Sequence, residues 1–107
     1  MTGQHLLERL ADRLRVVGPR LAARDSEAAH QVLAQVRAGL QRLADLAAEA
    51  EGRPSRVVPE LAPHALGDVA LVLGHDLFAG DLDGKPEVRA AAIATMTEIS
   101  DLLWADR

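Results

Sequence analysis

The segment from Ser26 to Glu51 constrains the fold of this chain more than any other feature of its sequence. Its apolar residues recur at alternating steps of four and three, the spacing that places them in one stripe of a long helix. Those residues are Ala29, Leu33, Val36, Leu40, Leu43, Ala47 and Ala50. Such a helix spans about 39 Å, and its stripe has to be covered by other helices. Ser26 is a favourable N-terminal cap, and Gly52 followed by Pro54 predicts the end of the helix.

Three further helices are predicted by the same spacing and by residues that start or stop helices. They cover residues 5–17, 64–79 and 86–105. Pro63 and Pro86 suit the first turn of the last two helices, because an N–H group has no helical partner there.

Gly18 and Pro19 predict an interruption after the first helix. Pro19 cannot donate to the carbonyl of residue 15, and it disfavours helical geometry at the residue before it. Residues 20–24 either resume the helix as a kinked extension or leave it, and the sequence keeps both possibilities open. Residues 52–63 contain three prolines. We expect them to form an extended crossover that lies on an apolar surface.

Composition points to the same fold class. The chain has 107 residues, a length typical of one domain, and its aromatic residues are one tryptophan and one phenylalanine. The β-branched and aromatic residues that favour strands are scarce, whereas the abundant alanine, leucine and arginine favour helices. We therefore predict an all-α, single-domain four-helix bundle. Its expected core consists of Leu10, Leu14, Leu33, Val36, Leu40, Leu43, Leu66, Leu73, Leu77, Met96, Ile99 and Leu103.

Two glycines, Gly67 and Gly74, lie inside the third predicted helix, where each costs about 1 kcal/mol relative to alanine. They share a second stripe with Leu71 and Phe78, about 100° from the core stripe. One stripe is enough for a helix at the edge of a small bundle, so we expect a closely packed helix or segment to cover the second. The Gly18–Pro19 region, the crossover or the same helix of a second copy would serve. Symmetry favours the last, and we predict a homodimer with these four residues at its interface.

Charge is distributed unevenly along the chain. Residues 1–56 carry nine arginines and seven acids, a net +2, whereas residues 57–107 carry three basic residues and nine acids, a net −6. The two halves can therefore attract each other, within one chain or between two. Neither half has the dense basic stripe that nucleic-acid binding requires.

His64 and Asp68 are the best candidates for a metal or small-ligand site, because residues four apart are neighbours on a helix. A stable metal site needs three or four ligands, and His30 would be a third only if the fold brings it close. The simpler interpretation is a pair at the helix start, with Asp68 favouring the protonated histidine. We therefore predict no metal and no cofactor. No serine lies in a nucleophile motif, and the absence of cysteine excludes thiol chemistry.

These features favour a non-enzymatic helical module that acts by binding another protein. One alternative is a metal- or ligand-binding bundle, with possible enzymatic activity, that uses His64 and Asp68. The second is a DNA-binding regulator, although the helix at 86–105 carries Arg89 as its one basic residue and its acids would repel phosphate. The N-terminal residues show no basic region followed by an apolar core, so we expect no signal peptide, and no apolar run approaches the length of a membrane span. A cytoplasmic location follows as the expectation.

Overall fold

The chain folds into four α-helices without a strand, according to a computed structural model that describes residues 3–60, 62–79, 82 and 84–105. The short 3-10 helix η1 (Pro63–Ala65) leads into the third of them. The helices are α1 (Gly3–Arg24), α2 (Glu27–Glu51), α3 (Leu66–Ala79) and α4 (Pro86–Ala105). The predicted all-α four-helix fold is confirmed, and the last three helices have nearly the predicted bounds.

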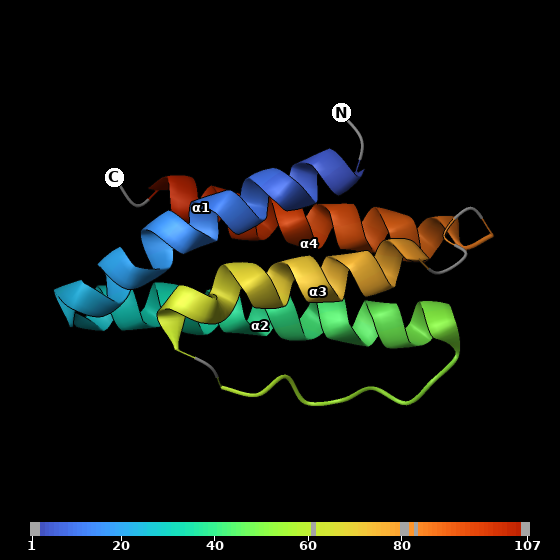
Figure 1. Cartoon of the computed structure of the whole chain (residues 1–107), viewed down its shortest axis with the longest axis horizontal. Helices are drawn as coiled ribbons and strands as arrows, with labels where there is room; N and C mark the ends of the chain where they lie inside the picture. The colour runs from blue at the N-terminus through green and yellow to red at the C-terminus, as the bar shows by residue number, and fades with distance from the viewer. Residues whose placement is uncertain (1–2, 61, 80–81, 83, 106–107) are drawn as a thin grey trace.

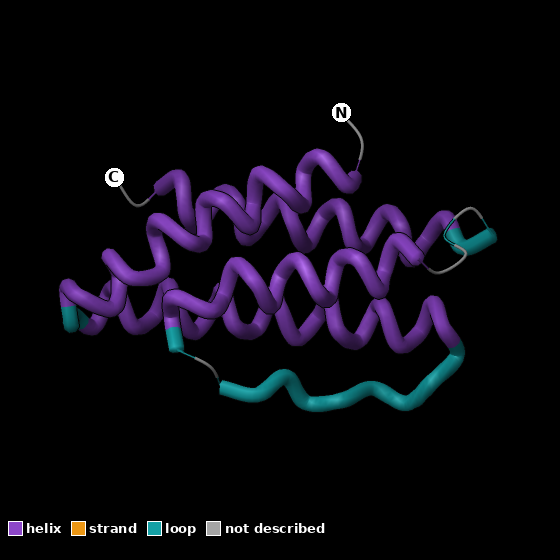
Figure 2. The backbone as a smooth tube through the Cα atoms, in the orientation of Figure 1, coloured by secondary structure: helices purple, strands orange, loops and turns teal. Residues whose placement is uncertain are grey.

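The helices do not follow one another around the bundle in chain order. Figure 1 shows α1 and α4 running in one direction and α2 and α3 in the other. The crossover, described for residues 53–60 and 62, returns along the length of the molecule to make α2 and α3 parallel (Figure 2). Each of α1 and α2 packs against both α3 and α4. Over the described residues, α3 and α4 occupy diagonal positions, without a close approach of their backbones.

Both ends of α2 are capped as its sequence predicts. The Ser26 hydroxyl accepts a hydrogen bond from the Ala29 amide at 3.1 Å. Gly52 adopts the left-handed conformation, with φ 68°, that terminates many helices. At the same end, the Lys85 ammonium group donates to the carbonyl oxygen of Ala50 at 2.7 Å. The positive charge also opposes the negative end of the helix dipole.

The predicted interruption at Gly18 and Pro19 is wrong, because α1 continues through Pro19 to Arg24. Pro19 removes one hydrogen bond, but Val17 and Leu21 on either side of it are buried in the core. Tertiary packing of this kind outweighs a local propensity. Gly18 has a different role from the expected one. A Cβ atom there would lie 2.7 Å from the Pro63 carbonyl oxygen, so glycine allows η1 to approach α1.

The core is close to the predicted one. Eleven of its twelve predicted residues are buried, the exception being Leu73, which is half-buried. The core also contains residues outside that list of twelve: Leu7, Ala11, Val17, Leu21, Ala29, Ala44, Ala47, Ala48, Ala50, Ala70, Leu82, Val88 and Ala92. Many of these are alanines, which allow the helices to lie close together.

Ion pairs connect the basic half of the chain to the acidic half within one molecule. Arg15 of α1 contacts Asp68 of α3 at 3.0 Å, and Arg42 of α2 contacts Glu98 of α4 at 3.2 Å. All four side chains are substantially exposed, so each pair contributes at most about 1 kcal/mol. The pairs favour this arrangement of neighbouring helices more than they raise the stability of the fold. No helix in the described ranges combines the length and apolar content needed to cross a bilayer.

Candidate binding groove

The two glycines of α3 face α1 of the same chain. A Cβ atom at Gly67 would lie 2.7 Å from the Ala11 carbonyl oxygen, and one at Gly74 would lie 2.5 Å from Cδ1 of Leu7. Both distances are too short for a side chain. The glycines therefore allow α1 and α3 to pack closely, which is the close helix contact that the sequence predicted.

The neighbour that packs against these glycines is α1 of the same chain. Gly67 and Gly74 are buried against α1, so neither is available to a second copy in this arrangement. Leu71 and Phe78 are half-buried and pack against the core of their own chain. The Phe78 ring occupies the space beside Gly3, where a Cβ atom would lie 2.7 Å from its Cζ. The four residues are thus already packed within one chain, and a homodimer stays a prediction.

The packing of α3 onto α1 exposes the opposite edge of its apolar surface. The buried face centres on Leu66, Ala70 and Leu77 together with the glycines. This buried face lies between the two predicted stripes. The side of the core stripe that is farther from the glycines therefore turns outward. Leu73 is consequently half-buried, and Val72 beside it is 62% exposed.

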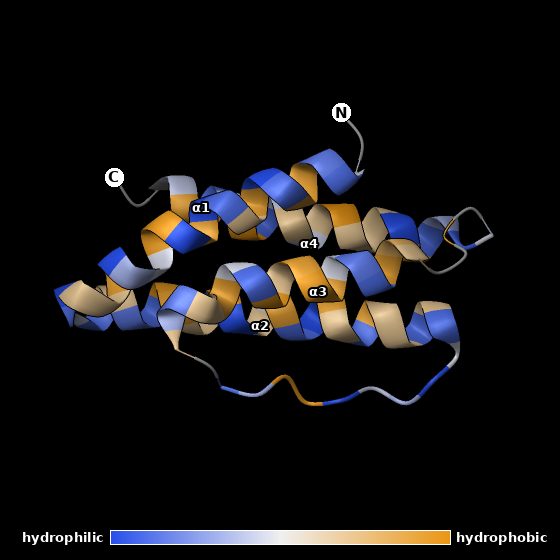
Figure 3. Cartoon of the chain, viewed as in Figure 1, coloured by the Kyte–Doolittle hydropathy of each residue, from blue (hydrophilic) through white to orange (hydrophobic). Residues whose placement is uncertain are grey.

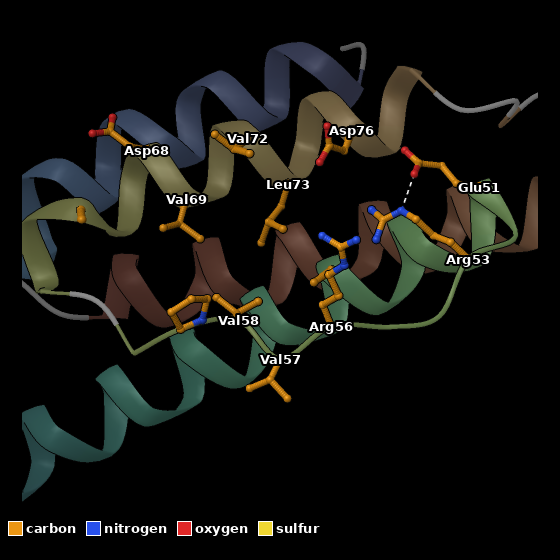
Figure 4. Close-up of a pocket in the computed structure, with 13 residues that line it drawn as sticks. Glu51, Arg53, Arg56, Val57, Val58, Asp68, Val69, Val72, Leu73 and Asp76 are labelled. Atoms are coloured by element: carbon orange, nitrogen blue, oxygen red, sulfur yellow. Dashed lines mark hydrogen bonds and ion pairs between the residues drawn. The ribbon is translucent and has the colours of Figure 1, made fainter.

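A groove of about 750 Å³ lies along this outward edge. Its walls are α3, the C-terminal part of α2 and the crossover, as Figure 4 shows. The apolar side chains of the groove come from α3 and the crossover, and charged side chains lie at its rim. The volume falls within the range of sites that bind small molecules or short segments. The main apolar residues that face the groove are Val58, Val69, Val72 and Leu73.

The crossover is attached to α2 by two polar side chains. Gln41 accepts a hydrogen bond from the Val58 amide at 2.7 Å and donates one to the Arg56 carbonyl oxygen at 2.9 Å. Asp45 accepts hydrogen bonds from Gln41 and from the Ser55 hydroxyl. These bonds hold the extended segment at a distance from α3 and so keep the groove open.

Side chains of the crossover alternate in direction, as expected for an extended segment. Arg56 and Val58 project toward α3, whereas Val57 points away from it (Figure 4). Val57 is 87% exposed. The expectation that the crossover covers an apolar surface is therefore met only in part, because the segment borders an open groove. Figure 3 shows the hydrophobic middle of this connection between hydrophilic stretches.

The attachment of the crossover should depend on the ionisation of Asp45. Hydrogen bonds from Ser55 and Gln41 lower the pKa of its carboxyl below the ordinary 3.8. A depressed pKa in the folded state means that the attachment is stabilised above about pH 4 and is lost as pH falls through the folded pKa. The Val58 amide shift in NMR spectra should therefore move as the solution is acidified. Asp45→Ala should move it at neutral pH, whereas Asp12→Ala, a control on α1, should not.

A Val58 amide shift that stays constant on acidification and is unchanged by Asp45→Ala would contradict this prediction. Because the Asp45 side chain is exposed, neither change should lower the overall melting temperature appreciably.

The charged rim contains three groups that are already paired and two that are not. Arg53 forms an ion pair with Glu51, and Asp68 forms one with Arg15 of α1. The Arg56 guanidinium, on the crossover, and the Asp76 carboxylate, on α3, make no such contact among the described residues. One cation and one anion on opposite walls are thus available to a bound group.

The predicted metal candidates are not brought together. His64 is exposed, Asp68 contacts Arg15, and the third possible ligand, His30, contacts Asp25 at 3.1 Å. Over the part of the chain that the structure describes, no three His, Asp or Glu side chains are grouped so that they could hold a metal ion. The alternative that uses His64 and Asp68 gains no support from this arrangement.

Sequence reasoning missed the groove. One signal was available, since Val57 and Val58 are apolar residues within a proline-rich connection. Which way they face depends on the attachment by Gln41, which the sequence does not reveal.

The comparisons with known proteins identify no relative of this chain. The sequence matches no family model, no curated protein and no solved structure. The functional argument therefore rests on the geometry of the groove.

Proposed function

We propose that this chain is a non-enzymatic helical module that binds another protein, and that the groove between α3 and the crossover is its binding site. The observation that carries this proposal is the apolar wall of the groove beside the exposed Val72. Burial of such side chains is the main source of affinity in protein association. A cytoplasmic location belongs to the same proposal and rests on the sequence alone.

Selection of peptides tests the proposal without a known partner. A displayed library of random peptides would be panned on the wild-type chain, with an excess of soluble Val72→Asp to remove ligands that bind elsewhere. We expect the enriched peptides to lose at least about tenfold in affinity for Val72→Asp, because a buried carboxylate on an apolar wall is strongly unfavourable. Isothermal calorimetry on the synthesised peptides measures this loss.

Val16→Asp provides the matched control. Val16 is also an exposed valine on a helix, but it lies on α1 and does not line the groove. Both variants should melt close to the wild type, since the substituted side chains are exposed. Peptides that bind wild type and Val72→Asp equally would refute the groove as the binding site.

The predicted homodimer remains a proposal, now separated from the α3 glycines. Light scattering during size-exclusion chromatography measures the oligomeric state. A dimer that Val72→Asp dissociates, while Val16→Asp leaves it intact, would assign the groove to a second copy instead of a different protein.

A further inference from the structure

We infer that the groove accepts a short extended segment of the partner, with apolar side chains at alternate positions and a carboxylate beside Arg56. This inference rests on the proposed function and specifies the shape and chemistry of the segment. Three properties of the groove support it: its size, the position of its apolar walls and the charges at one end.

The length of the groove suits a short extended segment. The part of the fold that lines it on one side, from Ala65 to Asp76, extends about 16 Å along the helix axis. About five residues of extended chain have that length.

The apolar walls face each other across the groove. Val58 projects from the crossover toward Val69 and Leu73 of α3, and Val72 lies at the edge (Figure 4). An extended segment between them directs every second side chain inward. Two successive inward positions would then lie against valine and leucine, so aliphatic side chains suit them.

The charges lie at the end of the groove near Asp76. The Arg56 backbone is fixed by the hydrogen bond from Gln41, and its guanidinium projects into the groove without a partner among the described residues (Figure 4). A guanidinium binds a carboxylate through two parallel hydrogen bonds. Asp76 on the opposite wall repels an acid, which places the carboxylate of the segment next to the crossover. Arg53 is less available because Glu51 already neutralises it.

The inference predicts both the sequence of the selected peptides and their response to Arg56→Gln. We expect peptides in which two aliphatic residues are separated by one residue. One residue should likewise separate this pair from an acidic residue before or after it. Arg56→Gln should weaken their binding about fivefold, the effect of losing one exposed charge pair. Replacing the acid of the peptide by its amide should weaken binding to the wild type by the same factor. The same replacement should hardly change the affinity for Arg56→Gln. Asp76→Asn should strengthen binding.

The outcomes separate this inference from the function on which it rests. Peptides that depend on Val72 but lack an acid, ignore Arg56→Gln or become helical on binding would overturn the inference and leave the proposed function intact. Peptides that do not depend on Val72 would overturn both. If no peptide is enriched and decanoate instead shifts the NMR signals of Val69 and Leu73, the groove binds a small amphipathic anion, which also overturns both.

Discussion

Replacing Gly74 with leucine should lower the melting temperature by roughly 10 °C or more, equivalent to at least about 2 kcal/mol in a domain of this size. A Cβ atom at this position would already lie 2.5 Å from Cδ1 and 2.8 Å from Cγ of Leu7. Leu7 is fully buried, so it cannot move aside without disturbing its neighbours in the core. Overpacking by added methylene groups costs about 1–3 kcal/mol and at times more, and the four added carbons of leucine place this substitution at or above the upper limit. The better helix propensity of leucine recovers about 1 kcal/mol of that loss.

His75→Leu is the control for this substitution, because His75 follows Gly74 on α3 and is exposed. It introduces the same side chain at the next position of the helix, on an exposed site. Thermal unfolding followed by circular dichroism would compare the two variants. A Gly74→Leu protein that melts at or above the wild-type temperature, while a wild-type dimer becomes a monomer, would restore the glycines to an interface between copies.

Leu77→Ala and Leu73→Ala should differ strongly in stability although both residues belong to the same predicted stripe. Leu77 is completely buried, and its truncation should cost about 3 kcal/mol through lost burial and the cavity that remains. Leu73 is half-buried beside the open groove, where water can fill the vacated space, so its truncation should cost about 1 kcal/mol. Urea denaturation with a common m-value measures both changes.

Equal losses for the two leucines would show that the groove is closed in solution. A larger loss for Leu73→Ala than for Leu77→Ala would mean that α3 is rotated away from α1, with its predicted core stripe fully buried. Either result would also remove the structural basis of the proposed binding site.

The helices could be predicted because their signals are local. The stripe of α2 and its caps at Ser26 and Gly52 specify that helix without reference to the rest of the chain. Whether residues 20–24 continue α1 beyond Pro19 could not be decided from the sequence, because the outcome depends on the burial of Leu21. Local rules place a break wherever a proline and a glycine are adjacent, and only the packing of the complete fold decides whether the break occurs.

The groove was less predictable than the helices, since it depends on the rotation of α3. Gly67 and Gly74 correctly indicated a close helix contact, but a helical wheel does not identify the neighbour that makes it. Once α1 occupies the glycine side, Val72 and Leu73 turn toward solvent. The attachment of the crossover by Gln41 is a contact between residues 17 positions apart, for which the sequence carries no periodic signal.

The order of the helices affects how this chain reaches its fold. The close neighbours α1 and α3, and likewise α2 and α4, are separated in sequence by an entire helix and the crossover. The last two helices form no hairpin of their own, since α3 and α4 have no close backbone approach within the described ranges. Much of the core can therefore form only after the chain closes a long loop, which costs entropy before any contact compensates for it. The higher contact order makes folding slower than in a bundle whose consecutive helices pair.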